Sequence, residues 1–270
     1  MTDDTQRNQD RKALVTYFSL VTVLCIILYA FIFTGRGLDA LGGYVLPLMM
    51  WAPGVAGLVT TLVIYRSFSP LGLLGNRSTF VWIIACIAVP IVYTLLIKQG
   101  LAAAGVIKLP GQSLPVVVLV LGLFVSLGTA LGEELGWRGF AAPVLARVYG
   151  FWPGQLMLGA YWFLYHLPGL LGTSYGSSPH PIAGNLMFGL SCIFLSCFLG
   201  AARLKSDSVW PSAFFHASHN FFFQNWFEPA EAQSSAADYL VGEQGLMLLV
   251  MMAVLLAYTR RAIPPARIGA

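Results

Sequence analysis

The stretch Leu114–Gly139, LPVVVLVLGLFVSLGTALGEELGWRG, decides the fold class of this protein. Its first 18 residues, Leu114–Leu131, carry no charge, and a helix needs about 20 mostly apolar residues to cross the hydrocarbon core of a bilayer. Two glutamates and an arginine follow directly. The stretch therefore predicts a membrane-spanning helix that ends in, or continues through, a group of charged side chains.

Seven further apolar runs of similar length surround this stretch, and short segments rich in Gly, Pro and Ser separate them. Together they predict an all-α, polytopic transmembrane helix bundle of about eight spans, that is, an integral, multi-pass membrane protein. The eight runs are Ala13–Phe33, Tyr44–Tyr65, Thr79–Ile97, Leu114–Leu131, Phe151–Leu171, Ala183–Ala202, Val209–Phe227 and Val241–Tyr258.

The composition excludes most other classes of protein. Of the 270 residues, 57 % are hydrophobic and 10 % are charged, and the mean hydropathy is +0.75. A soluble domain has about 25 % charged residues. The net charge of +4 comes from basic residues that lie singly or in pairs between apolar runs, so we expect no nucleic-acid partner. The four cysteines lie inside apolar runs without metal-binding spacing and read as core residues.

The basic residues predict how the bundle is oriented. If the N-terminus is cytoplasmic, twelve fall on the cytoplasmic side and three on the other, so both termini should be cytoplasmic. The stretches Gly172–Pro181 and Glu228–Glu243 would then lie outside. The cytoplasmic set is Arg7, Arg11, Lys12, Arg66, Arg77, Arg138, Arg147, Arg203, Lys205, Arg260, Arg261 and Arg267, and the other is Arg36, Lys98 and Lys108.

The same pattern predicts a simple domain organisation. Residues 1–12 form a cytoplasmic N-terminal tail, and residues 259–270 form a cytoplasmic C-terminal tail. Residues 13–258 form a single membrane-embedded helical domain, in which the polar motifs fall within about 114–227.

Ionisable side chains inside a membrane domain indicate function, because burying a charge in lipid is costly. Glu134 and Arg138 are four residues apart, so they share a helix face and can pair. Glu133 projects about 100° away from that face and can point at a different partner. The alternative is a helix end that reaches the lipid headgroups, where these side chains are merely solvated.

Two more polar places lie on later runs. His166 stands among aromatic residues in YWFLYHLP, where it is either a functional group or a satisfied core histidine. His216 and Asn220 are four residues apart in HASHN and share a helix face. His219, three residues from His216, is expected to lie nearby but to point about 100° away from Asn220. These side chains could also join helices through hydrogen bonds. Charged and polar residues on three separate runs nevertheless favour a common interior site.

The three motifs resemble those of the CPBP family of intramembrane proteases, also called the CAAX protease and bacteriocin-processing or Abi family. Its motifs EExxxR, FxxxH and HxxxN match Glu133, Glu134 and Arg138, then His166, then His216 and Asn220. The phenylalanine of the second motif is replaced by Trp162, which keeps an aromatic ring. The resemblance covers about Leu114–Phe227, and the eight-span layout is compatible with it.

The resemblance implies an intramembrane endopeptidase. Glu133 and His166 would hold and activate a water molecule, His216 and Asn220 would bind the oxyanion, and Glu134 with Arg138 would orient the site. A metal-dependent alternative stays open, because Glu133, His166 and His216 could form a two-histidine, one-carboxylate zinc site. For Glu133 to reach His166, the fourth helix must continue past Arg138 towards Arg147.

Membrane lipid and a peptide or protein substrate are the expected partners. The family accommodates prenylated C-terminal peptides and leader peptides. Two non-proteolytic alternatives remain. A membrane immunity or scaffold protein of the same family would use the polar cluster structurally, and a transporter would use it to relay protons. No internal repeat or pair of broken helices supports transport.

Overall fold

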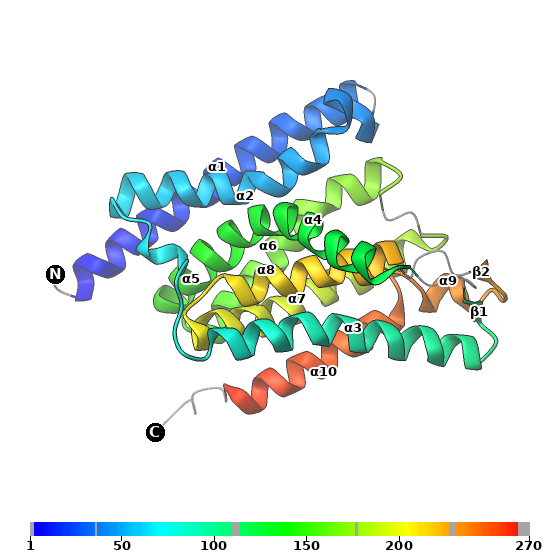
Figure 1. The fold of residues 1–270 in the computed structure, drawn as a ribbon. Coiled ribbons are helices and arrows are strands. Elements are labelled where there is room, and N and C mark those ends of the chain that lie inside the picture. The colour runs from blue at the N-terminus through cyan, green and yellow to red at the C-terminus, as the bar shows by residue number, and fades with distance from the viewer. Residues whose placement is uncertain (1–2, 36, 110–113, 176–177, 227–230, 264–270) are drawn as a thin grey trace.

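Long apolar helices make up almost the whole chain in the computed structural model, which describes residues 3–35, 37–109, 114–175, 178–226 and 231–263 (Figure 1). The fold is all-α, as predicted, and the α-helices follow the eight apolar runs. They are α1 (Asp3–Thr34), α2 (Val45–Thr60), α3 (Thr79–Ala103), α4 (Val116–Glu134), α5 (Ala142–Tyr149), α6 (Phe151–Gly172), α7 (Pro181–Ser206), α8 (Trp210–Ser218), α9 (Ala237–Leu240) and α10 (Leu246–Ala262).

Shorter elements extend or connect these helices. Three π-helical segments continue α2, α4 and α8, and an exposed ion pair between Lys108 and Glu231 accompanies a two-stranded antiparallel ladder. The 3₁₀ helices are η1 (Gly37–Gly43) and η3 (Ser69–Leu71), the π-helical segments are η2 (Thr61–Tyr65), η4 (Leu135–Ala141) and η5 (His219–Trp226), and the strands are β1 (Ile107–Lys108) and β2 (Glu231–Ala232).

Five helices of the described chain are long and apolar enough to cross a bilayer, so the protein is an integral, multi-pass membrane protein. The other three predicted runs are also helical, as α6, α8 with η5, and α10, but they are shorter or less apolar. Whether these three cross the membrane completely stays a prediction. The five spans are Asp4–Thr34, Val45–Tyr65, Thr79–Ala103, Val116–Tyr149 and Pro181–Ser206.

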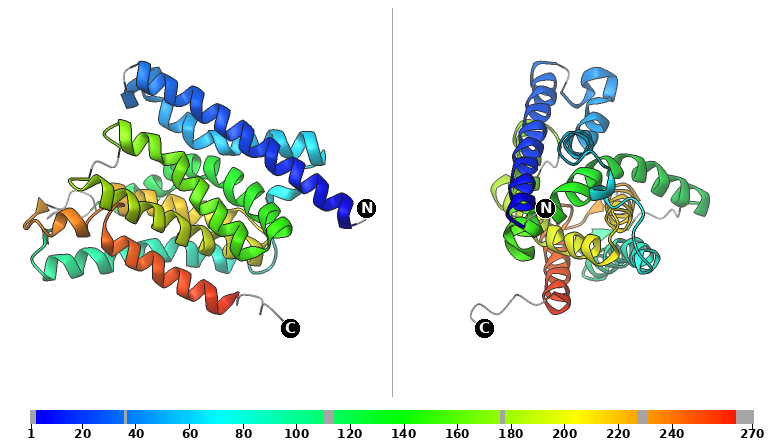
Figure 2. Two further views of the ribbon diagram at one scale, coloured as in Figure 1. Left: turned by 180° about the vertical axis from the view of Figure 1, so that it is seen from behind. Right: turned by 90° about the vertical axis from the view of Figure 1, so that its left-hand side faces the viewer.

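The two ends of the bundle differ in what they hold. Both chain termini lie at one end, and the two strands and α9 lie at the other (Figures 1 and 2). We call these the terminal end and the strand end. Helices α1, α3, α6 and α8 begin at the terminal end, whereas α2, α4, α7 and α10 begin at the strand end.

Helix α4 continues without a break through η4 and α5 to Tyr149, as the sequence predicts. Gly150 then turns the chain with a φ of 85°, and α6 begins. Glu133 lies 17 residues after Val116 and 16 residues before Tyr149. At 1.5 Å per residue it is roughly 25 Å from either end of this helix. The predicted site is therefore at mid-depth in the bundle.

Glycines bring α2 and α4 into close contact beside Glu133. A Cβ atom on Gly54 would collide with the carbonyl oxygen of Gly132, and one on Gly136 would collide with the backbone of Pro53. Small residues allow helix backbones to approach in this way. The close approach fixes α4 on both sides of the two glutamates and so sets their position.

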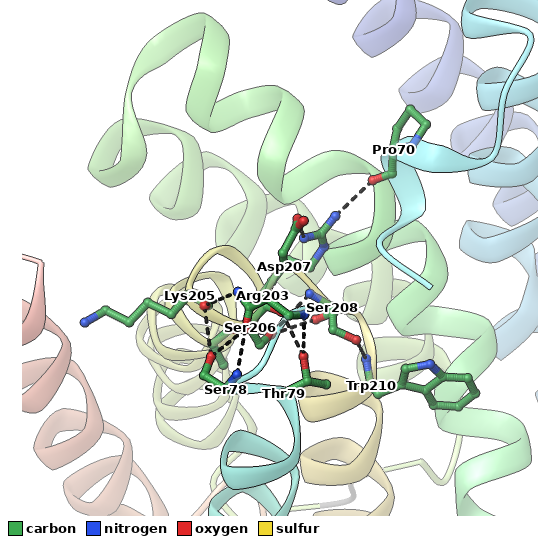
Figure 3. A network of polar contacts seen from close by, with 11 residues as sticks. Pro70, Ser78, Thr79, Arg203, Lys205, Ser206, Asp207, Ser208 and Trp210 are labelled. Atoms are coloured by element: carbon green, nitrogen blue, oxygen red, sulfur yellow. Dashed lines mark hydrogen bonds and ion pairs between the residues drawn. The ribbon is translucent and has the colours of Figure 1, made fainter. Parts of the chain in front are cut away.

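A polar network fastens the terminal end of the bundle. It joins the loop between η2 and α3 to the turn between α7 and α8 (Figure 3). Arg203, which is 3 % exposed, pairs with Asp207 at 3.1 Å and donates to the carbonyl of Pro70 at 3.0 Å. Nearby, the Thr79 hydroxyl donates to the Ser206 carbonyl at 2.9 Å. These contacts hold the loop against the helix turn.

Candidate active site

A cavity of about 240 Å³ lies among helices α1, α2, α4, α6, α7, α8 and α10. Most of its wall is apolar, and a small set of polar side chains faces it. These are Glu133, His166, Ser191, His216, His219, Asn220, Gln224 and Glu243. The cavity thus brings together one or more residues from each of the three motifs that the sequence singled out.

Glu133 is held in this wall by two indole groups. Its Oε2 atom accepts hydrogen bonds from Nε1 of Trp137 at 3.1 Å and from Nε1 of Trp162 at 3.0 Å. The residue is 3 % exposed. Hydrogen bonds to an ionised acceptor are about twice as strong as those between neutral groups. The two indoles therefore fix the carboxylate in place and satisfy one of its oxygens.

Glu134 and Arg138 form the predicted ion pair directly behind the cavity wall. Arg138 Nη1 lies 2.8 Å from Glu134 Oε1, and both side chains are fully buried. The same oxygen contacts Nδ1 of His216 at 2.9 Å. Because a carboxylate only accepts, Nδ1 carries a proton in this contact. Glu134 therefore connects Arg138 on its own helix to His216 on α8.

The ring of Trp162 covers the other side of Arg138. The distance from Cζ of Arg138 to the ring centroid is 4.2 Å, and Arg138 Nε and Nη2 have no hydrogen-bond partner among the residues that the structure describes. A guanidinium over an indole face is attracted by the ring quadrupole. The aromatic ring thus helps to hold the buried cation.

His166 faces the cavity from α6 in a defined orientation. Its Nδ1 atom lies 2.8 Å from the carbonyl oxygen of Trp162, one turn earlier. A carbonyl only accepts, so Nδ1 is the donor and Nε2 of the neutral ring is left as a basic atom. Trp162 therefore contacts Glu133 through its indole and His166 through its backbone.

Two comparisons with known proteins agree with this arrangement. Residues 115–222 match the family model described as "Type II CAAX prenyl endopeptidase Rce1-like". The chain is also 28 % identical over 138 residues to a "CAAX prenyl protease 2" of Methanococcus maripaludis. The aligned region covers 50 % of this chain and 48 % of the relative. The chain thus spans about half the length of this curated relative.

Over residues 115–222 the chain is similar to the CPBP/CAAX protease family. The matched region contains all three motifs, from Glu133 to Asn220. The resemblance predicted from the motifs is therefore confirmed over this region, whereas the catalytic roles of the individual residues stay predictions.

The metal-dependent alternative has no suitable ligand set among the described residues. Within the described ranges, no group of three or more His, Cys, Asp or Glu side chains is arranged to hold a metal ion. Glu133 is occupied by two indole donors, and His216 donates from Nδ1 to Glu134. The residues proposed as ligands do not fit a zinc site in this arrangement, so we derive no step through a metal.

His219 also belongs to the cavity wall. It was expected to lie near His216 but about 100° from Asn220, and it lines the same cavity as both. Residues three apart are neighbours on the surface of a helix, which brings His216 and His219 together. The π-helical segment η5 begins at His219, and its wider turn reduces the rotation per residue, so Asn220 and Gln224 reach the same cavity.

Glu243 is a cavity residue that the sequence did not identify, because it falls in an acidic segment assigned to an outer loop. Its Oε1 atom contacts Nε2 of His219 at 3.1 Å and accepts from Nε2 of Gln224 at 2.8 Å. His219 Nδ1 contacts the hydroxyl of Tyr93. This second group therefore ties α3, η5 and the segment before α10 together beside the first.

Proposed function

We propose that this protein is an intramembrane endopeptidase of the CAAX-protease type. The observation that supports this most strongly is the placement of Glu133. A carboxylate fixed by two indole donors at mid-depth faces a cavity that it shares with three histidines and an asparagine. Such an arrangement suits peptide hydrolysis, which needs an activated water, stabilisation of an oxyanion and a proton donor for the leaving amine.

In this proposal Glu133 and His166 hold and activate the water. Glu133 takes a proton from the water as it attacks the scissile carbonyl. His166 contributes the basic Nε2 atom, which accepts a hydrogen bond from the same water. The proton is then passed to the leaving amine, so the enzyme returns to its starting state.

His216 and Asn220 stabilise the negative charge on the carbonyl oxygen. Asn220 donates from its amide. His216 donates from Nε2 when both ring nitrogens carry protons, and in that form Nδ1 donates to the carboxylate of Glu134. Glu134 and Arg138 act as positioning residues, because they hold the His216 ring and do not reach the cavity themselves.

The substrate class follows from the cavity wall and from the relative's name. The wall is mainly apolar, which suits a peptide segment that is itself apolar or lipid-modified and arrives from the membrane. A prenylated C-terminal peptide and a leader peptide both satisfy this description. The membrane lipid is the second expected partner.

A comparison of newly formed peptide N-termini in membranes tests the proposal. Membranes containing the wild type should show cleavage products that are absent with Glu133→Gln, a change that keeps the size of the side chain and removes the base. Glu231→Gln is the matched control, because this exposed glutamate lies in β2 and should leave the products unchanged. Identical products with the wild type and Glu133→Gln would favour a non-catalytic immunity or scaffold protein.

A further inference from the structure

The cavity extends from the middle of the bundle to the strand end. It takes residues from the last turns of α1 and α6 and from the first turns of α2 and α10, where those helices meet at the strand end. Connecting segments complete the wall. The lining residues outside the α-helices are Leu38 in η1, and Tyr175 and Glu243 in loops.

The other half of the bundle is closed to a peptide. Below Glu133, towards the terminal end, large side chains are fully buried and in contact. The network around Arg203 then fastens the loop between η2 and α3 over this end (Figure 3). The buried side chains in this half include Trp137, Phe140, Val144, Leu145 and Leu158, each at most 1 % exposed.

The two ends of the bundle also differ in charge. Among the described residues outside the cavity, the terminal end carries ten basic and three acidic side chains, and the strand end carries two basic and three acidic ones. Positive charge marks the cytoplasmic side of short membrane loops. The ten are Arg7, Arg11, Lys12, Arg66, Arg77, Arg147, Arg203, Lys205, Arg260 and Arg261, with Asp4, Asp10 and Asp207 at the same end; the two are Lys98 and Lys108, with Asp39, Glu231 and Asp238.

Arg138 must be removed from the count that the sequence suggested. It was assigned to a cytoplasmic segment, but it is fully buried beside Glu134 at mid-depth. The excess of basic side chains at the terminal end remains when Arg138 is left out. The strand end, and with it the cavity, is therefore assigned to the non-cytoplasmic side of the membrane.

We propose that substrates enter this cavity from the non-cytoplasmic side, so that the enzyme cleaves peptide segments that lie in or next to the outer half of the bilayer. The direction of entry follows from the position of the cavity and the charge of the two ends. That a bound peptide is cleaved rests on the function proposed above.

Cysteine labelling tests the direction of entry without requiring catalysis. All four native cysteines are changed to alanine, and one cysteine is then introduced by Leu38→Cys in the cavity wall or by Leu74→Cys at the terminal end. Leu74 is 93 % exposed and lies in the loop after η3. A membrane-impermeant maleimide is applied to right-side-out and to inverted bacterial vesicles that contain each variant. Tyr175→Cys is a second cavity position.

The cavity cysteines should react in right-side-out vesicles, and Leu74→Cys should react only in inverted ones. Cavity cysteines that react only in inverted vesicles, or that fail to react in right-side-out vesicles at both positions, would overturn the proposal. The same labelling is expected in the Glu133→Gln background, so loss of proteolysis does not affect it.

The positions of the cleavage sites in membrane substrates provide a second test of the direction of entry. They should map to non-cytoplasmic or outer-half segments of their substrates. Cleavage confined to cytoplasmic segments would overturn the direction of entry while leaving the endopeptidase intact. Complete absence of cleavage would overturn the proposed function while the labelling still decides which side the cavity faces.

Discussion

Replacement of Trp162 by phenylalanine removes a single hydrogen bond from the proposed base. The indole Nε1 of Trp162 donates to Glu133 Oε2 at 3.0 Å, and the same oxygen keeps its second donor, Trp137, at 3.1 Å. Phenylalanine keeps an aromatic ring beside Arg138. It also preserves the backbone carbonyl that orients His166. The change therefore acts mainly on how the Glu133 carboxylate is held.

The expected magnitude follows from the charge of the acceptor. A hydrogen bond to a charged group contributes about 1.5–3 kcal/mol, which corresponds to about 10- to 150-fold in rate if the bond orients the carboxylate in the transition state. Because one indole donor remains, we expect a loss near the lower limit for Trp162→Phe. The double variant with Trp137→Phe should lose more.

Cleavage rates in liposomes measure this effect, and a matched tryptophan provides the control. Trp210 donates from Nε1 to the carbonyl of Leu73 at 2.8 Å, far from the cavity. Trp210→Phe removes an indole hydrogen bond of similar length and should leave the rate unchanged. A Trp162→Phe enzyme that is folded and as fast as the wild type would refute the idea that the indoles position the base.

Three further predictions concern the oxyanion site, the helix contact and the cavity wall. His216→Ala and Asn220→Ala should each raise the activation free energy of cleavage by about 2.7–4 kcal/mol. The double variant should raise it by less than the sum, because both donors serve one oxygen. Additive losses would show that the two side chains act on different atoms. Gly136→Ala should lower the free energy of unfolding, measured by thermal unfolding, by about 1–3 kcal/mol because the added methyl group overpacks against α2. Gly128→Ala should not, because the space around Gly128 is open. Equal melting temperatures of the two variants would contradict the close contact. N-ethylmaleimide should leave the wild type substantially active, because Cys192, although it lines the cavity, is only 5 % exposed and buried thiols react slowly. Inhibition that is absent in Cys192→Ala would contradict this and show a reactive thiol in the cavity wall.

Local sequence patterns were sufficient to predict the helices and the first motif. Each apolar run forms a helix because its backbone hydrogen bonds must be satisfied within the segment. The four-residue spacing of Glu134 and Arg138 predicted their ion pair, which the structure places at 2.8 Å. The need for Glu133 to reach His166 predicted that α4 continues past Arg138, and it does.

Contacts between helices could not be predicted in this way. The bond between Glu134 and His216 joins residues 82 positions apart, and the one between His219 and Glu243 joins residues 24 positions apart. Both depend on how the helices pack. The π-helical turn at His219 also has no simple sequence pattern. Trp162 was noted only as a departure from the family's phenylalanine, yet it contacts four other site residues, namely Glu133, Arg138, His166 and His216.

The cleavage rate of Glu133→Gln tests the central claim most directly. The wild type and the variant are reconstituted in liposomes with a peptide that contains a cleavage site found in membranes. If Glu133 is the general base, the variant should be at least about 100-fold slower while its thermal unfolding is unchanged, and Glu231→Gln should match the wild type. Near-normal turnover by a folded Glu133→Gln protein would contradict the account.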